Sequence, residues 1–359
     1  MNDARPMRGI RLAVTALVIS SSACTTAHEI PADWKAECVG RMQLSLPGEV
    51  EVAADTLTSW HKYSSPRVGY FPDEQVAGWS SYSVLGQIQV SHALTEVELD
   101  SFMQDSQRSR DKFRPGGSVQ KTMGTKPYRE LSVQPQKGIA WDFDATRYAI
   151  FQVGSHVFGW TAGASPGAAA SSLDDRYNTI VNGLRSRDTF TNPQEAGLCL
   201  PYTFIRDDDK TSRNIGSTYR LRKHPDVTVY LRDATAASHK NKEVLTAKYR
   251  TNDFWAQYGG GTTDFKSVWS PSSKGIALGG QAGMQTFVQF IRKDGTQDFG
   301  YLAVAPGDPE GKQDTPDLML YVIRDAKNAK AKGIEPVSKE TFLEMAQAIA
   351  ESVKRRPVQ

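Results

Sequence analysis

The sequence is poor in cysteine and has no long apolar run. Three cysteines among 359 residues are too few for a fold held together by many disulfides. The most apolar stretch, Leu12 to Ile19, has eight residues, whereas a helix that crosses a membrane needs about 20. No other stretch comes close to it, so we expect no retained transmembrane helix.

An excess of charge of one sign is also lacking. The chain has 43 lysines and arginines against 40 acidic residues. Because residues 1–24 contain three of the arginines and one aspartate, 40 basic and 39 acidic residues remain in the rest of the chain. A nearly neutral surface does not attract nucleic acid over its whole area. We therefore expect no nucleic-acid partner.

Residues 1–24 have the pattern of a signal peptide. Arginines precede the apolar run, and small residues follow it up to Cys24. The end, Ser22-Ala23-Cys24, resembles a lipobox, which predicts lipidation of Cys24 and contact with the membrane through that lipid. Because Ser21 stands where a lipobox usually has an aliphatic residue, cleavage to a soluble product is the alternative. Both predict the periplasm of a Gram-negative bacterium, and lipidation predicts anchoring to the outer membrane.

The other two cysteines, Cys38 and Cys199, form a possible pair in an oxidising compartment. They lie 161 positions apart, and closing so long a loop stabilises a fold by about 4 kcal/mol in the chain-entropy account. Spacing alone does not show that two cysteines are close together. A disulfide and two buried free thiols therefore both remain open.

The sequence predicts an α+β fold of two similar domains, each an antiparallel sheet with flanking helices. Residues 188–197 are rich in turn-forming residues and lack hydrophobic periodicity. We place a linker there, between an N-terminal α+β domain at 25–187 and a C-terminal α+β domain at 198–359.

Hydrophobic periodicity predicts the elements of each half. In the first half we predict strands at 82–90, 139–143, 148–153 and 157–160, a helix after Thr95, and a helix over 173–184. In the second half we predict strands at 227–231, 287–291, 301–304 and 318–323, a helix at 242–249, and a closing helix after Ser338. Thr95 and Glu98 fit a capping box, and the basic residues 354–356 suit the end of the closing helix.

Both halves open on a cysteine near a leucine-proline pair. Cys38 precedes Leu46-Pro47, and Cys199 is followed by Leu200-Pro201. The chain runs 147 residues from Cys38 to Arg185, at the end of the last predicted helix of the first half. It runs 155 residues from Cys199 to Lys354, at the end of the closing helix. We interpret this as a diverged duplication, with coincidence between two generic α+β domains as the alternative.

We predict no catalytic, cofactor or metal-binding residues. Gly163 to Gly167 fits the nucleophile-elbow pattern around Ser165. The residue after the nucleophile must donate its N–H to the oxyanion, however, and Pro166 has no N–H. The histidines stand singly, outside recognised metal spacings, and are interpreted as surface or packing residues. They are His28, His61, His92, His156, His224 and His239.

Three further patterns are weaker. Gly259 to Gly261 lacks the lysine of a phosphate-binding loop and is interpreted as a flexible loop. The carboxylates of 207–209 and 308–314 lack the order of ligands in an EF-hand and are interpreted as solvated loops. The aromatic residues Trp60, Tyr63, Tyr70 and Phe71 either cover the core of the first domain or anchor an interface.

Two short segments resemble a known family. Glu37-Cys38-Val39-Gly40-Arg41, followed by Leu44 to Pro47 and Val50 to Ala53, is similar to the opening of the type four Tle-cognate immunity proteins. Gly197 to Pro201 with Phe204-Ile205 is similar to the start of their C-terminal domain. The resemblance covers both halves in order, and Gly279, Gly280 and Gly283 add to it.

This resemblance implies an immunity protein that binds and inhibits a phospholipase effector of a type VI secretion system. It implies a cognate effector protein as the partner, no enzymatic activity and no cofactor. The inhibitory residues are not identified by it. Two alternatives remain, a non-enzymatic envelope lipoprotein acting as scaffold or adaptor, and an envelope hydrolase that uses Ser165.

Overall fold

The computed structural model describes residues 30–55, 68–163, 170–258, 264–310 and 314–358. The strands up to the predicted linker are β1 (Trp34–Val39), β2 (Met42–Pro47), β3 (Val50–Val52), β4 (Val68–Tyr70), β5 (Val76–Trp79), β6 (Ser81–Val84), β7 (Gln87–Val90), β8 (Tyr128–Leu131), β9 (Lys137–Phe143), β10 (Thr146–Val153), β11 (His156–Gly163) and β12 (Leu184–Ser186). The strands that follow are β13 (Gly197–Leu200), β14 (Thr203–Arg206), β15 (Arg213–Leu221), β16 (Val227–Ala234), β17 (Asp264–Ser267), β18 (Ser273–Leu278), β19 (Gln281–Ile291), β20 (Gln297–Ala305), β21 (Asp317–Arg324) and β22 (Lys354–Arg355). The helices are α1 (Glu96–Asp111), α2 (Ser118–Met123), α3 (Ala170–Gly183), the 3₁₀ helix η1 (Lys242–Leu245), α4 (Ala247–Tyr258), α5 (Ala326–Ala331) and α6 (Lys339–Ser352).

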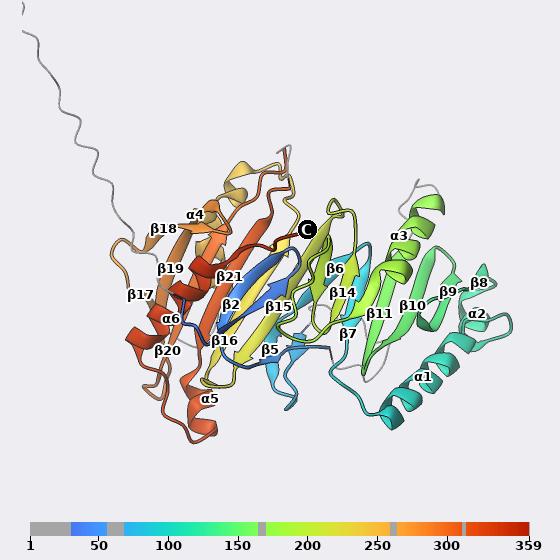
Figure 1. Ribbon diagram of the computed structural model, residues 1–359, viewed down its shortest axis with the longest axis horizontal. Helices are drawn as coiled ribbons and strands as arrows, with labels where there is room; N and C mark the ends of the chain where they lie inside the picture. Colours follow the sequence, from blue (N-terminus) through green and yellow to red (C-terminus); the bar gives the residue numbers. More distant parts are fainter. Residues whose placement is uncertain (1–29, 56–67, 164–169, 259–263, 311–313, 359) are drawn as a thin grey trace, which may run out of the picture.

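One large sheet runs through both halves of the chain (Figure 1). It has 14 strands in the order β17-β19-β20-β21-β16-β15-β6-β7-β11-β10-β9-β8, with β18 beside β19 and β3 beside β15. The halves meet where β15 pairs antiparallel with β6, Arg213 lying opposite Val84 and Gly216 opposite Ser81. The two halves are therefore joined by backbone hydrogen bonds, which are satisfied only when both are folded.

Two small sheets cross the same junction. In the first, β2 pairs with β1 and with β22, so that Met42 lies opposite Arg355. In the second, β14 pairs with β12 and β13, on either side of the predicted linker. Segments from the beginning, middle and end of the described chain thus meet over the centre of the large sheet (Figure 1).

The large sheet is packed on both faces. Phe287, Phe299 and Tyr301 belong to the main core, whereas the alternating neighbours Val288 and Leu302 belong to a second cluster with Trp255 of α4. Because successive side chains of a strand point to opposite faces, the two cores lie on opposite sides of the sheet. A third cluster lies between α1 and the strands β9 to β11.

The main core supplies much of the stability. It contains buried residues of both halves, including Trp160 of β11, Leu198 of β13 and Phe342 of α6. Burial of one such side chain contributes about 1.5–3 kcal/mol. No helix among the described residues has both the length and the apolar character required to cross a bilayer.

The α+β prediction is confirmed, and most of the predicted elements are present. One predicted strand is wrong. Residues 82–90 form two strands, β6 and β7, which pair as a hairpin with Ser83 opposite Gln87. Leu85 at the turn has a φ of 57°, a left-handed conformation that no strand continues through. The duplication and the linker boundary remain predictions.

The basic residues 354–356 do not lie at a helix end as predicted. α6 ends at Ser352, and Lys354 and Arg355 form β22 against β2. Arg356 is 3 % exposed and donates hydrogen bonds to the carbonyl oxygens of Glu195 (2.9 Å) and Gly197 (2.8 Å). It therefore holds the predicted linker to the end of the described chain.

Candidate functional site

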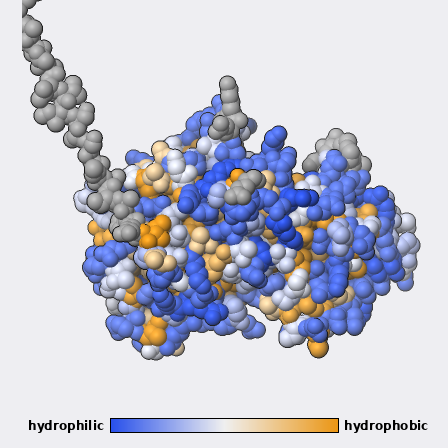
Figure 2. Space-filling model, in the orientation of Figure 1, coloured by the Kyte–Doolittle hydropathy of each residue, from blue (hydrophilic) through white to orange (hydrophobic). Residues whose placement is uncertain are grey.

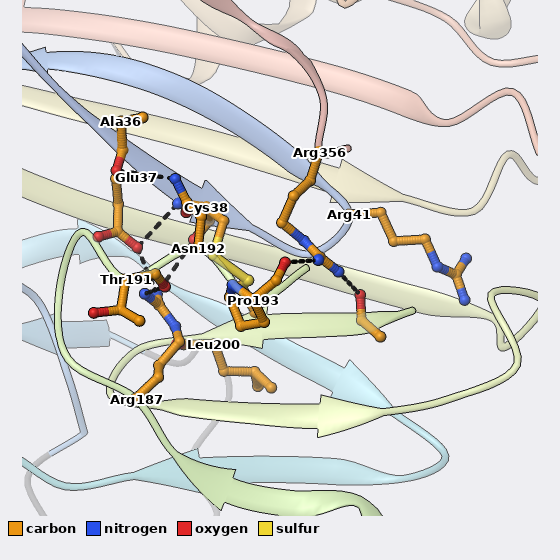
Figure 3. Close-up of a disulfide and its surroundings, with 12 residues drawn as sticks. Ala36, Glu37, Cys38, Arg41, Arg187, Thr191, Asn192, Pro193, Leu200 and Arg356 are labelled. Carbon is orange, nitrogen blue, oxygen red and sulfur yellow. Dashed lines mark hydrogen bonds and ion pairs between the residues drawn. A yellow bond between two sulfur atoms is a disulfide. The ribbon is translucent and has the colours of Figure 1, made fainter. Parts of the chain in front are cut away.

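The two motifs that carry the family resemblance lie side by side (Figure 3). Cys38 of β1 and Cys199 of β13 form a disulfide, with their Cα atoms 5.7 Å apart. The Gly40 N–H donates to the Cys199 carbonyl oxygen (2.8 Å), and the Cys199 N–H donates back to Gly40 (2.9 Å). Both cysteines are buried, so the structure brings together the two residues whose pairing the sequence left open.

A buried ion pair lies next to the disulfide. Glu37 is 0 % exposed and accepts hydrogen bonds from the guanidinium of Arg187 and from the Phe190 N–H. The Arg187 Nε donates to the Leu200 carbonyl oxygen at 3.1 Å. Removing one partner of such a pair leaves an unpaired buried charge, which costs about 3–5 kcal/mol. We call Glu37, Cys38, Gly40, Arg187 and Cys199 the clasp.

Gly40 has a conformational reason to be glycine. Its φ is +58°, and a Cβ at this position would collide with the carboxylate of Asp233. Asp233 is 0 % exposed and accepts from the Arg41 N–H (2.7 Å) and from Arg213 Nε (2.7 Å). The glycine therefore lets β1 and β2 approach a buried carboxylate of β16.

A cluster of three arginines and three aspartates lies beyond Gly40. Arg41 binds Asp207 (Nη2 to Oδ2, 2.7 Å) and Asp209 (Nε to Oδ1, 2.7 Å). The other members are Arg213 and Arg355, which both contact Asp314, at 2.9 Å and 3.0 Å, and Arg355 also binds Asp209 at 2.6 Å. We call these six residues the Arg–Asp cluster. It borders a hollow of about 620 Å³.

The interpretation of 207–209 and 308–314 as solvated loops is wrong for Asp207 and incomplete for Asp209 and Asp314, which bind arginines, whereas Asp208 and Asp308 are exposed as predicted. The Asp207 side chain is 1 % exposed. Burial opposes ionisation of Asp314, but its hydrogen bonds and its proximity to Arg213, Arg355 and Arg41 outweigh that effect and lower its pKa. Asp207, Asp209 and Asp314 are held by charge-assisted bonds to arginine, and their partners lie far away in the sequence.

Two of the singly placed histidines come together in space. His92 and His156 line a hollow of about 350 Å³ with Tyr202. The remaining residues of its wall are Pro72, Ala93, Arg187, Asp188 and Thr189. We call it the histidine hollow. Across the part of the chain with described coordinates, no group of three or more histidine, cysteine or acidic side chains is arranged to hold a metal ion.

Several predicted positions lie outside the described residues. They are the signal peptide with Cys24, the elbow pattern at Ser165 and Pro166, the glycines 259–261, His28, His61, Trp60 and Tyr63. Of the aromatic group, Phe71 is buried against Ala53 and Ala77. Phe71 therefore covers a small core, as one of its two interpretations predicts.

The fold and these sites define a class of protein. It is an α+β protein whose halves share one sheet and are joined by a buried disulfide and a buried ion pair. Residues 191–358 match the family model described as the Tle cognate immunity protein 4 C-terminal domain. This match bears out, for residues 191–358, the resemblance noted in the sequence.

Solved structures show the same fold over most of the chain. The immunity protein TplEi of the type VI secretion system from Pseudomonas aeruginosa, complexed with an "L" peptide, matches with a TM-score of 0.55 and 15% identity, over 91% of this chain and 99% of that chain. The Tle4–Tli4 complex matches with a TM-score of 0.58 and 16% identity, over 91% of this chain and 99% of that chain. Apo TplEi matches with a TM-score of 0.58 and 16% identity, over 91% and 98%. A comparison with curated proteins by sequence finds no match.

Proposed function

We propose that this chain is an immunity protein that binds and inhibits a cognate phospholipase effector of a type VI secretion system. The observation that carries the proposal is the match of residues 191–358 to an immunity-protein domain. The shared fold with TplEi and with Tli4 supports it for the whole chain. Protection of the producing cell follows, because an inhibited phospholipase leaves its membranes intact.

The clasp suits a protein inhibitor. A binding surface that is already rigid loses little conformational entropy on association, so more of the contact energy appears as affinity. The disulfide and the buried Glu37–Arg187 pair fix the two halves to each other before any partner is bound. An inhibitor of this kind works by surface complementarity, so the proposal assigns it no catalytic residue.

The visible face of the molecule supports recognition through polar contacts. Figure 2 shows a mostly hydrophilic face, on which hydrophobic residues form small separate areas. Interfaces between proteins that also exist apart have about the same apolar share as the rest of the surface. The face in Figure 2 is likewise mostly hydrophilic with small hydrophobic areas, so a partner that binds there would be recognised by shape and hydrogen bonds.

We further propose a periplasmic location with a lipid on Cys24, and two domains joined at 188–197. The charged, apolar and small-residue segments of 1–24 support the first proposal. Mass spectrometry of the N-terminal peptide from envelope fractions distinguishes a lipidated Cys24 from a soluble product. An N-terminus that retains residues 1–23 would contradict both.

The first experiment titrates residues 25–359, which lack the proposed signal peptide and lipid site, into a phospholipase assay of the proposed cognate effector, together with a binding titration. We expect inhibition that is complete near equal molar amounts, because a preorganised standard interface of about 1,600 Å² supports tight binding. A phospholipase from an unrelated secretion system is the matched control and should keep its activity.

The other outcomes decide between functions. Tight binding without loss of phospholipase activity would make the chain an adaptor. Absence of binding to the effector would reject the immunity function and favour an envelope scaffold. Ester hydrolysis by the chain alone, abolished in Ser165→Ala, would show an enzyme instead.

A further inference from the structure

The histidine hollow lies where the two halves of the chain meet. His92 follows β7 and His156 begins β11 in the first half, whereas Tyr202 lies in the turn between β13 and β14. Arg187 and Asp188 follow β12 and complete one wall. Any change of charge in this hollow therefore acts on the contact between the halves.

The Tyr202 ring is held by the histidines. The His156 ring stacks on it with the centroids 4.2 Å apart and the planes at 10°, and the His92 ring approaches its edge at 6.3 Å. Tyr202 has a φ of 57°, and a residue with a side chain pays about 1–2 kcal/mol in this left-handed region. Its hydroxyl donates to the Val52 carbonyl oxygen at 3.4 Å. The turn keeps this conformation because its neighbours pack against it.

The hydrogen bonds of the two imidazoles identify their tautomers. His156 Nδ1 lies 3.0 Å from the Ser91 carbonyl oxygen, and His92 Nε2 lies 2.8 Å from that of Tyr70. A carbonyl oxygen only accepts, so these two nitrogens carry the protons of the neutral rings. A second proton must go to His156 Nε2 or His92 Nδ1. Within the described chain, no carboxylate is hydrogen-bonded to either nitrogen.

The charged groups around the hollow stabilise a protonated histidine only weakly. Arg187 is itself positive, and its carboxylate partner Glu37 is already engaged by it. Asp188 is exposed, so water screens its attraction. Asp55, which bridges to Ser91, already accepts from the Val90 N–H. The two histidines would also repel each other once charged.

Burial has the largest effect on the pKa of both imidazoles. It lowers the pKa of His92, against the effect of the hydrogen bond to Tyr70. It also lowers the pKa of His156, against the hydrogen bonds to the Ser91 and His92 carbonyls. The face of the Tyr202 ring attracts a cation by about 0.5–1 kcal/mol where water is present. This attraction acts against the effect of burial on the pKa.

We propose that the histidine hollow is an acid-sensitive joint, in which protonation of His92 and His156 weakens the packing of the Tyr202 turn against the first half. A histidine in an unfolded chain has a pKa of about 6.5. Because the folded hollow lowers the pKa of both imidazoles, the unfolded state takes up protons first as the pH falls. The stability that the neutral imidazoles provide is therefore complete above about pH 6.5 and declines progressively below it.

The test measures the melting temperature of residues 25–359 between pH 7.5 and pH 5.0. The key variant combines His92→Gln with His156→Asn, because the amide of glutamine can replace Nε2–H and that of asparagine can replace Nδ1–H. We expect a larger downward shift of the melting temperature in the wild type than in this double variant. His239→Gln is the matched control, because His239 is exposed and, among the described residues, its ring hydrogen-bonds to the backbone of Asn241 alone. The melting temperature of this control should fall between pH 7.5 and pH 5.0 by as much as that of the wild type.

A second measurement does not depend on the folding of the variant. Nuclear magnetic resonance of ¹³C-labelled imidazoles in the wild type should show two histidines that titrate below the range of an unfolded peptide. Equal pH dependence of wild type and double variant, or ordinary titration of both imidazoles, would overturn the proposal. Because the chain is measured alone, neither result depends on the effector or on the proposed immunity function.

Discussion

The residues of the first family motif each have a separate structural role. Glu37 neutralises Arg187, Cys38 forms the disulfide, and Val39 is buried in the main core. Gly40 allows a close approach to Asp233, and Arg41 belongs to the Arg–Asp cluster. The motif is therefore explained by the junction between the halves, and it identifies the fold and not a binding surface.

Glu37→Gln tests the charge of the clasp. The substitution keeps the shape of the side chain but leaves Arg187 buried without a counter-charge. We expect the free energy of unfolding to fall by about 3 kcal/mol, measured by urea denaturation at pH 7.5. The control is Glu49→Gln, which removes an exposed contact with Lys35 and should leave the urea midpoint unchanged. Equal midpoints for all three proteins would show that the buried charge does not stabilise the fold.

The partners of individual charged residues were not predictable from sequence spacing. Arg41 and Asp207 are 166 positions apart, and Arg41 and Asp314 are 273 apart. Local patterns report only on neighbours along a helix or strand, so they classed Asp207 and Asp314 as solvated. The pairing of Cys38 with Cys199 was open for the same reason, although counting cysteines drew attention to both.

Single elements were predicted where a local signal is strong. The capping box at Thr95 is present, with the Thr95 hydroxyl accepting from the Glu98 N–H and Glu98 accepting from the Thr95 N–H (2.8 Å). The antiparallel strands β9, β10 and β11 were also found, because their short connections permit no other pairing. The hairpin of β6 and β7 was missed, because the alternation of apolar residues continues through its turn.

Thr95→Ala tests how much the capping box contributes to α1. Loss of the hydroxyl leaves backbone N–H groups of the first turn without a partner. We expect a loss of about 1 kcal/mol of unfolding free energy, measured by urea denaturation. Thr179→Ala is the control, because that exposed hydroxyl donates to the Asp175 carbonyl oxygen within α3. It should be neutral or slightly stabilising, and a similar loss in both variants would argue against a capping effect.

The arrangement of the strands in the whole molecule differs more from the prediction than the single elements do. Two separate sheets were expected, and one 14-stranded sheet continues from β16 through β15 into β6. Periodicity shows that a segment is a strand, but it does not show which distant strand lies beside it. The α+β class could be predicted from composition and periodicity, whereas the order of strands across the junction could not.

Removal of the disulfide tests the connection between the halves. We expect the double substitution Cys38→Ala and Cys199→Ala to lower the unfolding free energy by about 4 kcal/mol, because a long loop in the unfolded chain is no longer closed. The measurement is urea denaturation without reductant. The control is wild-type protein unfolded in the presence of reductant, and its urea midpoint should shift to that of the variant. A variant with the oxidised wild-type midpoint would show that the disulfide does not stabilise the fold.

The pairing of β2 with β22 has a consequence for synthesis of the protein. Met42 finds its partner Arg355 only after the ribosome has added the intervening residues, which takes tens of seconds at about 5–20 residues per second. Until then β2 has an open edge and the first half lacks part of its core. This pairing therefore forms only when synthesis is nearly complete, and contacts between segments so far apart in the sequence also slow folding. For the export proposed above this delay is an advantage, because a chain that is still unfolded can be threaded through a translocation channel.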